Sequence, residues 1–282
     1  MKQATRVLTL IAASAFIWIV AGAQQANPEK VTVPLTDPAR PVNLRVGILS
    51  GGISVKAYAG KEVIVEAHTR LGDEEEEEDS ENAGKRKGLK RIPNSSTGLS
   101  VEEEDNTVRV SNSGRWSSRK VDLSIQVPAN CSMKLSTVND GDIDVTGVKG
   151  ELDINNTNGS VTLKDVSGSV VAHALNGNIL VTMPSVYADK PMSFSSLNGE
   201  IDVTLPATIK ATVQLDNEQG EVYSDFDMVM DRSKPVVEES PKTKGGKYKV
   251  TVEKAMKGTI NGGGQEIQFK NYNGDIYIRK GK

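Results

Sequence analysis

Residues 139–147 read NDGDIDVTG, residues 157–165 read TNGSVTLKD, and residues 175–183 read LNGNILVTM. The three stretches share one pattern, in which a glycine turn is followed by alternating apolar and polar residues, and they start 18 residues apart. Apolar residues at every second position indicate a strand with one buried face. The repeat therefore predicts short β-strands that are separated by tight glycine turns.

Glycine recurs at every ninth position of this region, at Gly141, Gly150, Gly159, Gly168 and Gly177. Each glycine is followed two and four positions later by an apolar residue. These apolar pairs are Ile143 and Val145, Leu152 and Ile154, Val161 and Leu163, Val170 and Ala172, and Ile179 and Val181. Residues 139–183 are therefore predicted to hold five short strands and no helix.

Two architectures accommodate such strands. One is an antiparallel meander with two-residue hairpins, and the other is a β-solenoid, in which turns bend the chain around a flattened coil. Val148 lies three positions after Val145 and so changes parity, and the same shift recurs at Val166. A residue that changes parity but stays in the core requires a bend, which Gly147 tolerates. The phase of the apolar residues thus favours the β-solenoid over the meander.

The predicted fold class is all-β, a β-solenoid with glycine-punctuated turns and about 18 residues per turn in its regular part. Like residues of successive turns should stack about 4.8 Å apart in columns. The predicted columns are Ile143–Val161–Ile179, Val145–Leu163–Val181, Val148–Val166 and, at the turns, Asp140–Asn158–Asn176. The pattern repeats because one turn cannot bury its own apolar face and the next turn covers it.

The chain is predicted to contain five segments. They are a signal peptide (1–23), N-terminal strands that open the solenoid (24–127), regular repeats (128–229), a loop (230–247) and closing C-terminal strands (248–282). Within the second segment, residues 70–100 are predicted to form a disordered loop, because an acidic block and then a basic block occupy residues 73–91. Such a stretch cannot bury enough apolar surface to offset the entropy of ordering it.

The N-terminus has the three parts of a secretory signal. Lys2 and Arg6 provide positive charge, residues 7–20 form an apolar run, and AGA at residues 21–23 has the small-x-small form of a cleavage site. The apolar run is shorter than the roughly 20 residues that a spanning helix needs. We predict export to the periplasm or the cell surface, with no stable membrane span after processing; a retained membrane anchor is the alternative.

Composition limits the classes of partner and of chemistry. The net charge of −3 is small, which argues against nucleic acid as a partner. Aromatic residues make up 4% of the chain and glycine occurs 26 times, which suits thin layers of aliphatic side chains. Cys131 is the only cysteine, so no internal disulfide can form, and we interpret it as a small buried hydrophobe.

No catalytic, cofactor-binding or metal-ligating residue is predicted, and no cofactor. The two histidines, His68 and His173, do not lie near another metal-ligand type at a recognisable spacing. His173 is expected on a strand, facing solvent. No Gly-x-Ser-x-Gly elbow supports a serine nucleophile.

The aspartates of NDGDID resemble a calcium loop only superficially. With Asp140 counted as the first position, the sixth holds Val145, where such a loop needs glycine. Asp142 and Asp144 are expected to point outward into solvent. The predicted outward columns are Asp142–Ser160–Asn178–Glu200 and Asp144–Thr162–Leu180–Asp202. Small polar residues between the acids avoid stacked like charges, and this argues against a catalytic carboxylate cluster.

Three motifs carry a family resemblance. VDLSIQVP at residues 121–128, the glycine repeats of residues 137–183 and NGDIYI at residues 273–278 resemble a bacterial β-strand-repeat family known as "putative adhesin" or head-GIN-like. The resemblance spans most of the chain after the signal peptide and implies a repeat fold without recognised catalytic residues. The charged insert at residues 73–91 departs from the family pattern.

The predicted function is therefore that of a non-enzymatic exported β-solenoid, an adhesin-like binding protein or cell-envelope scaffold. Its expected partner is an envelope protein or glycan. The alternatives are a polysaccharide-acting hydrolase or lyase on a β-helix, and an envelope sensor or accessory subunit. Two or three outer carboxylates beside Arg or Lys would favour the enzyme, whereas an unbroken Ser, Thr and Asn face would favour the binder.

Overall fold

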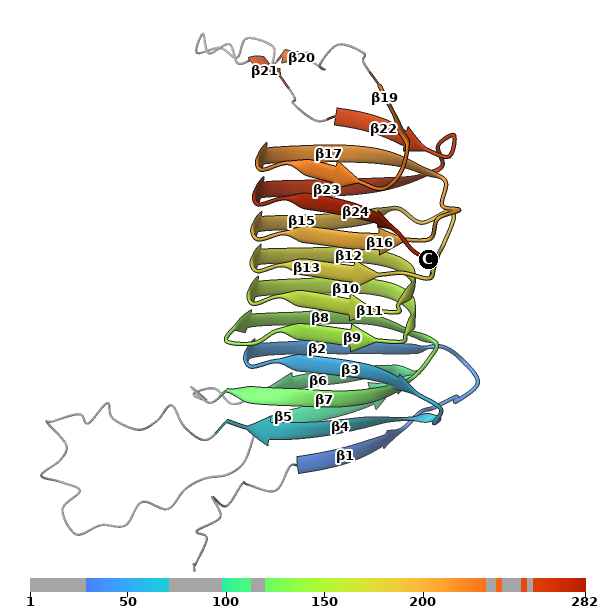
Figure 1. Cartoon of the computed structure of the whole chain (residues 1–282). Coiled ribbons are helices and arrows are strands. Elements are labelled where there is room, and N and C mark those ends of the chain that lie inside the picture. The colour runs from blue at the N-terminus through green and yellow to red at the C-terminus, as the bar shows by residue number, and fades with distance from the viewer. Residues whose placement is uncertain (1–28, 71–97, 113–119, 232–236, 240–249, 253–255) are drawn as a thin grey trace, which may run out of the picture.

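The computed structural model describes residues 29–70, 98–112, 120–231, 237–239, 250–252 and 256–282 (Figure 1). These residues form β-strands, turns and connections, and none of them is helical. The predicted signal peptide and the charged insert of residues 73–91 lie outside the described ranges, as does most of the loop predicted at residues 230–247. The all-β prediction is confirmed.

Most of the described strands form two long sheets, and the strands of both sheets are stacked along one common axis. In spatial order, sheet A contains β1 (Glu29–Pro34), β4 (Glu62–Thr69), β7 (Val121–Pro128), β3 (Ile53–Tyr58), β9 (Ile143–Thr146), β11 (Val161–Lys164), β13 (Ile179–Thr182), β16 (Ile201–Leu205), β24 (Ile276–Lys280) and β18 (Val222–Ser224). From β7 to β18 every neighbouring pair in sheet A is parallel.

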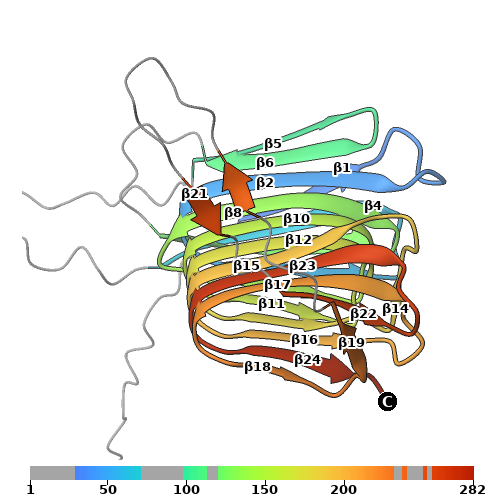
Figure 2. The ribbon, with the colours of Figure 1, turned by 90° about the horizontal axis from the view of Figure 1, so that it is seen from above.

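Sheet B faces sheet A. In spatial order it contains β19 (Met228–Met230), β22 (Met256–Ile260), β17 (Ala211–Gln219), β23 (Gln265–Asn273), β15 (Met192–Asn198), β12 (Ser167–Asn176), β10 (Lys149–Asn158), β8 (Cys131–Asn139), β2 (Val42–Ser50), β6 (Thr107–Asn112) and β5 (Leu99–Glu104). The short β14 (Ser185–Val186) also pairs with β12, and β20 (Val237–Glu239) pairs separately with β21 (Val250–Val252). Seen along the stack, the two sheets form facing layers joined by tight corners at one end and longer connections at the other (Figure 2).

The register of the short strands confirms the solenoid and excludes the meander. Val161 on β11 pairs in parallel with Ile143 on β9 and with Ile179 on β13. Its neighbours in sheet A are thus residues 18 positions away on either side, as one full turn requires. From β8 to β13, successive strands belong alternately to sheet B and sheet A, so the turns at Gly141, Gly159 and Gly177 each carry the chain from sheet B to sheet A.

The core is a set of aliphatic columns between the two layers. Val161, Leu163 and Val166 are fully buried. The residues one turn before and after Val161 and Leu163 are buried as well, and so is Val148, one turn before Val166. Val148 is 1% exposed, which confirms that the parity change occurs at a bend within the core. Aromatic packing inside the core includes Phe194 on β15 stacked on Phe269 on β23, with ring centroids 5.3 Å apart.

Stacking order and chain order differ at both ends of the solenoid. The early strands β2 and β3 lie between β6–β7 and β8–β9, although they precede all of these in sequence. The last strands, β23 and β24, lie between β15–β16 and β17–β18 (Figure 1). The coil of β2 and β3 and the coil of β23 and β24 are therefore each flanked by other coils on both sides.

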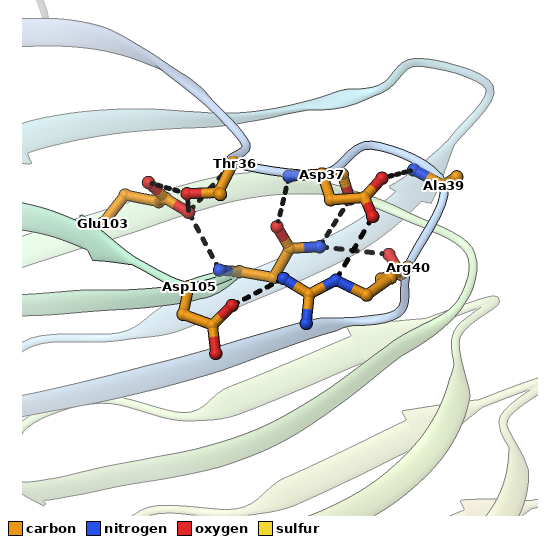
Figure 3. A network of polar contacts seen from close by, with 7 residues as sticks. Thr36, Asp37, Ala39, Arg40, Glu103 and Asp105 are labelled. Atoms are coloured by element: carbon orange, nitrogen blue, oxygen red, sulfur yellow. Dashed lines mark hydrogen bonds and ion pairs between the residues drawn. The ribbon is translucent and has the colours of Figure 1, made fainter.

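A polar network closes the N-terminal part of the stack (Figure 3). It joins the β1–β2 connection to the tight β5–β6 turn, where Asn106 has a positive φ of 60° and is 2% exposed. The Asn106 side chain accepts a hydrogen bond from the Asp37 backbone N–H (2.7 Å) and donates one to the Asp37 carbonyl (2.6 Å). The Glu103 carboxylate accepts hydrogen bonds from the backbone N–H groups of Thr36 (3.1 Å) and Asn106 (2.9 Å).

Candidate binding surface

Asparagine side chains form a hydrogen-bonded ladder where sheet B strands enter the tight corner. Asn158 donates a side-chain hydrogen bond to Asn139 (3.1 Å), and Asn176 donates one to Asn158 (2.9 Å). Asn198 continues the ladder by donating to Asn176 (2.8 Å). Each contact joins neighbouring coils, so the ladder runs parallel to the stack axis.

The first member of the predicted turn column was wrong. Asn139, not Asp140, occupies the position that stacks with Asn158. Asp140 is an extra residue between this asparagine and the corner Gly141, and it adopts a positive φ of 60°. In the later coils the asparagine directly precedes the glycine. An aspartate tolerates this backbone conformation better than most residues, which is why the insertion is accommodated without loss of stacking.

A second polar row, which sequence reasoning missed, lies on the inside of the same corner. Its members satisfy corner glycine carbonyl groups that would otherwise be unpaired in the core. Thr137 donates to the carbonyl of Gly51 (2.8 Å), Asn156 to Gly141 (3.0 Å), Ser196 to Gly177 (3.1 Å) and Asn271 to Gly199 (2.9 Å). A signal was available, because a polar residue three positions before the glycine recurs in NNTNG, SSLNG and KNYNG.

Of the two predicted outward columns, the one through Asp144 lies on the strands of sheet A, and the one through Asp142 lies in the turns directly before those strands. The Asp142 carboxylate accepts a hydrogen bond from the Ser160 backbone N–H (2.7 Å), and Asn178 accepts one from that of Glu200 (2.9 Å). These side chains thus bridge adjacent coils. No group of three or more histidine, cysteine, aspartate or glutamate side chains suitable for a metal ion occurs in the part of the chain that the structure describes.

His173 and Cys131 lie where the sequence placed them. His173 is exposed on the outer face of β12, and His68 is exposed on β4. Cys131 is fully buried at the start of β8, and desolvation raises the pKa of its thiol to about 12. A thiol of this kind is protonated at neutral pH and is a poor nucleophile.

A shallow groove of about 740 Å³ crosses the outer face of sheet B. It extends over β2, β8, β10 and β12 and reaches the connection before β15. Its polar lining consists of Asn43, Arg45, Ser132, Lys134, Glu151, Asp153, Ser169 and Lys190. These residues are adjacent because parallel strands of four coils place them in register, for example Lys134 beside both Arg45 and Asp153.

Ion pairs and one unpaired guanidinium set the electrostatics of the groove. Lys134 pairs with Asp153 (2.7 Å), and Lys190 pairs with Glu151 (3.2 Å). Arg45 lies next to Lys134 and makes no ion pair with any residue in the described ranges. Sequence reasoning missed this site, because Arg45 precedes Lys134 by 89 positions and no repeat predicts that β2 pairs with β8.

The described residues contain no helix with the length and apolar character that a bilayer-spanning helix needs. The strands that carry the groove are rigidly placed, because each has a hydrogen-bonded neighbour on both sides. The groove can therefore present fixed donors, acceptors and charges to a ligand along several coils. Its open shape suits an extended ligand better than a small molecule that must be enclosed.

Comparisons with solved structures find chains of similar extent. A "putative cell adhesion protein" from Clostridium sporogenes is 14% identical, with 90% of this chain and 100% of that chain covered and a TM-score of 0.47. A "putative adhesin" from Bacteroides fragilis is 12% identical, with 90% and 96% covered and a TM-score of 0.35. A "putative lipid binding protein" from Parabacteroides distasonis is 10% identical, with 91% and 97% covered and a TM-score of 0.25. No curated protein matches the chain.

The comparison with family models gives a direct assignment. The model of the family described as Toastrack DUF4097 matches residues 133–279, just over half of the 282-residue chain. The matched span begins in β8 and ends in β24, so it includes all of the regular coils. It confirms the adhesin-like family resemblance that the sequence predicted. The chain belongs to the Toastrack DUF4097 family and has its β-solenoid-like fold.

Proposed function

We propose that this chain is an exported, non-enzymatic binding protein of the bacterial cell envelope, and that the outer face of sheet B is its binding face. The groove of about 740 Å³ carries the proposal, since it combines unpaired Arg45 with hydroxyl, amide and ion-paired groups across four coils. The N-terminal signal pattern of residues 1–23 supports export.

The alternative of a polysaccharide-cleaving enzyme is the less supported one. Glu151 and Asp153 do lie together in the groove beside lysines, as an enzyme of this class would require. The general acid of such an enzyme, however, normally lies in a pocket that shields its carboxyl group from water. Both carboxylates are instead open to solvent, with 57% and 41% of their side chains exposed.

The test is a crosslinked pull-down from an extract of the protein's own cell envelope. Arg45→Glu should strongly reduce the recovered envelope material, because the groove would lose its one unpaired cation. Lys56→Glu is the matched control, since it makes the same charge change on the exposed outer face of sheet A. Equal recovery with both variants would mean that the groove is not the binding site.

A second measurement separates binding from catalysis. Envelope polysaccharide incubated with the protein should show no increase in chain ends. An increase that disappears in Glu151→Gln would establish the enzyme and overturn the proposal.

A further inference from the structure

A second region of sheet B, beside the tight corner, consists of three rows without any Lys, Arg, Asp or Glu side chain. We call this region the neutral strip. Its apolar row contains Leu49, Val138, Leu175, Leu197 and Tyr272, with the polar Thr157 between Val138 and Leu175. Its asparagine row contains Asn139, Asn158, Asn176, Asn198 and Asn273, and its small polar row contains Gly47, Ser136, Asn155, His173 and Ser195. Lys270, which follows Ser195 in the small polar row, ends the strip on the C-terminal side.

The apolar row faces solvent, although the surrounding surface is polar. Leu49 is 64% exposed, Leu197 is 38% exposed and Tyr272 is 50% exposed, and all three occupy the same register on their strands. Beyond the strip, the next row away from the tight corner belongs to the groove and contains Arg45 and Lys134. Charge depletion combined with exposed aliphatic and aromatic groups is typical of the core of a recognition surface.

The asparagine row keeps unused hydrogen-bonding capacity. A carboxamide offers two N–H donors and two acceptor lone pairs. In the ladder, Asn158 donates once to Asn139 and accepts once from Asn176, and Asn176 likewise donates to Asn158 and accepts from Asn198. Each interior rung therefore retains one donor and one acceptor, and this pair recurs at the strand spacing of about 4.8 Å.

The dimensions favour a narrow, extended ligand. Six rungs at the strand spacing give a length of about 24 Å, and a width of roughly 12 Å gives a footprint of about 300 Å². A stable protein partner, such as a second copy of this chain, buries about 800 Å² on each side. The strip is therefore long enough for several repeating units of a polymer but small for a protein interface.

We propose that the neutral strip binds an uncharged, extended polysaccharide that lies along the stack axis. Sugar rings present apolar C–H faces, which match the apolar row, and hydroxyl edges, which match the free donors and acceptors of the asparagine row. An extended β-1,4-linked chain advances per sugar by a distance comparable to the strand spacing, so successive sugars meet successive rungs. This inference rests on the proposed envelope-binding function and names the class of ligand.

The experiment is co-sedimentation of the purified protein with microcrystalline cellulose and with chitin, two uncharged extended polysaccharides. Leu175→Glu should lower the affinity about tenfold or more, because the ligand would desolvate an unpaired charge in the middle of the strip. Leu180→Glu is the matched control. Leu180 is 44% exposed but lies on the outer face of sheet A, so the affinity of this variant for the polysaccharide should not change. Tyr272→Ala should weaken binding as well, without adding a charge.

Ionic strength provides an independent readout. Binding to a neutral strip should be the same at about 0.1 M and about 1 M salt, although salt screens charged contacts strongly over that range. Binding only to an anionic polymer such as pectate, with loss at high salt, would overturn the inference. So would equal affinities of the Leu175→Glu and Leu180→Glu variants, or absence of binding to both cellulose and chitin.

Two further outcomes separate this inference from others. A concentration-dependent dimer that Leu175→Glu abolishes would show that the occupant is a second copy of the chain, and the polysaccharide assignment would fall. If envelope material is still recovered in the pull-down but neither uncharged polysaccharide binds, the inference fails while the proposed function stands. If nothing is recovered from the envelope, the proposed function itself fails.

Discussion

Asn176 on β12 donates a side-chain hydrogen bond of 2.9 Å to Asn158 on β10, and the two residues are paired across the parallel strands. A slip of one residue between these strands would place every buried side chain on the outer face. It would also bring Leu175 or Gly177 opposite Asn158 and break the side-chain contact. The asparagine ladder thus supports the register that the apolar columns require.

The contrast between Val161 and Thr162 tests the inward and outward phase of the coil. Val161→Asp should lower the free energy of unfolding by about 3–5 kcal/mol, because it buries an uncompensated charge among aliphatic side chains. Thr162→Asp should lower the free energy of unfolding by less than about 1 kcal/mol, and this small loss would come mainly from the repulsion between the new carboxylate and Asp144 on the neighbouring strand. Urea denaturation of both variants measures the difference, and equal midpoints would contradict the assigned phase.

The corner glycines should be intolerant of even one methyl group. A Cβ at Gly177 would lie 2.1 Å from the Gly159 carbonyl oxygen, which belongs to the backbone of the neighbouring coil. Gly177→Ala should therefore destabilise the protein by about 1–3 kcal/mol through overpacking.

Gly47 provides the control for that substitution. It lies in β2, and a Cβ there has no neighbouring atom within 4 Å. Gly47→Ala should be neutral or stabilise the protein by up to about 1 kcal/mol. Thermal unfolding midpoints of the two variants give the comparison, and a similar loss in both would argue against the close approach of the coils.

Cys131 should be unreactive in the native protein. Its thiol is fully buried, and desolvation raises its pKa to about 12, so almost no thiolate exists at pH 8. Ellman's reagent at pH 8 should modify no thiol in native buffer and one thiol per chain in denaturant. Fast labelling of the folded protein would show that β8 opens easily at its first residue.

Glu103 should make the N-terminal network sensitive to acid. Hydrogen bonds from the backbone of Thr36, then from its side chain and from Asn106, lower the pKa of this carboxyl below 4.5. Because the folded pKa lies below the unfolded one, the carboxylate stabilises the fold above pH 4.5, and this contribution is lost as the pH falls through the folded pKa.

The corresponding variant is Glu103→Gln. Its stability should fall less between pH 5 and pH 3 than that of the unsubstituted protein, since one titrating group is removed. Chemical denaturation at each pH measures the two slopes. Glu102→Gln on the same strand serves as the control, and parallel slopes for all three proteins would exclude a role for Glu103.

Processing at the N-terminus is testable by mass. We expect protein recovered from the envelope fraction to lack residues 1–23 and to begin at Gln24, because Ala21 and Ala23 fit the small-residue positions of a signal-peptidase site. Intact-mass spectrometry gives the answer directly. A full-length mass would favour the retained anchor.

The regular coils could be predicted because their pairing partners follow at a fixed interval along the chain. The column through Val161 joins residues 18 positions apart, so one periodic pattern specified both neighbours. The error at Asp140 arose from a single inserted residue, which shifts the apparent register but is absorbed by a backbone with positive φ. Local alternation could not reveal which of two adjacent polar residues stacks.

The ends of the solenoid and the groove could not be predicted, because they depend on pairings without a period. Asp37 and Asn106 are 69 positions apart, and no repeat links their two turns. Arg45 reaches Lys134 only because β2 lies between β6 and β8. In these regions the sequence predicts strands but contains no repeat that identifies their neighbours. The order in which the strands stack depends on how well entire sheet faces pack together.

The insertion of β23 and β24 between two earlier coils also has a mechanical consequence. The C-terminus leaves the stack from β24, which is hydrogen-bonded to β16 on one side and to β18 on the other. A pull on this end along the strand must shear two ladders at once, whereas an edge strand pulled across its ladder would unzip one bond at a time. A chain tethered by its C-terminus would therefore transmit tension to the middle of the solenoid and resist stepwise peeling from that end.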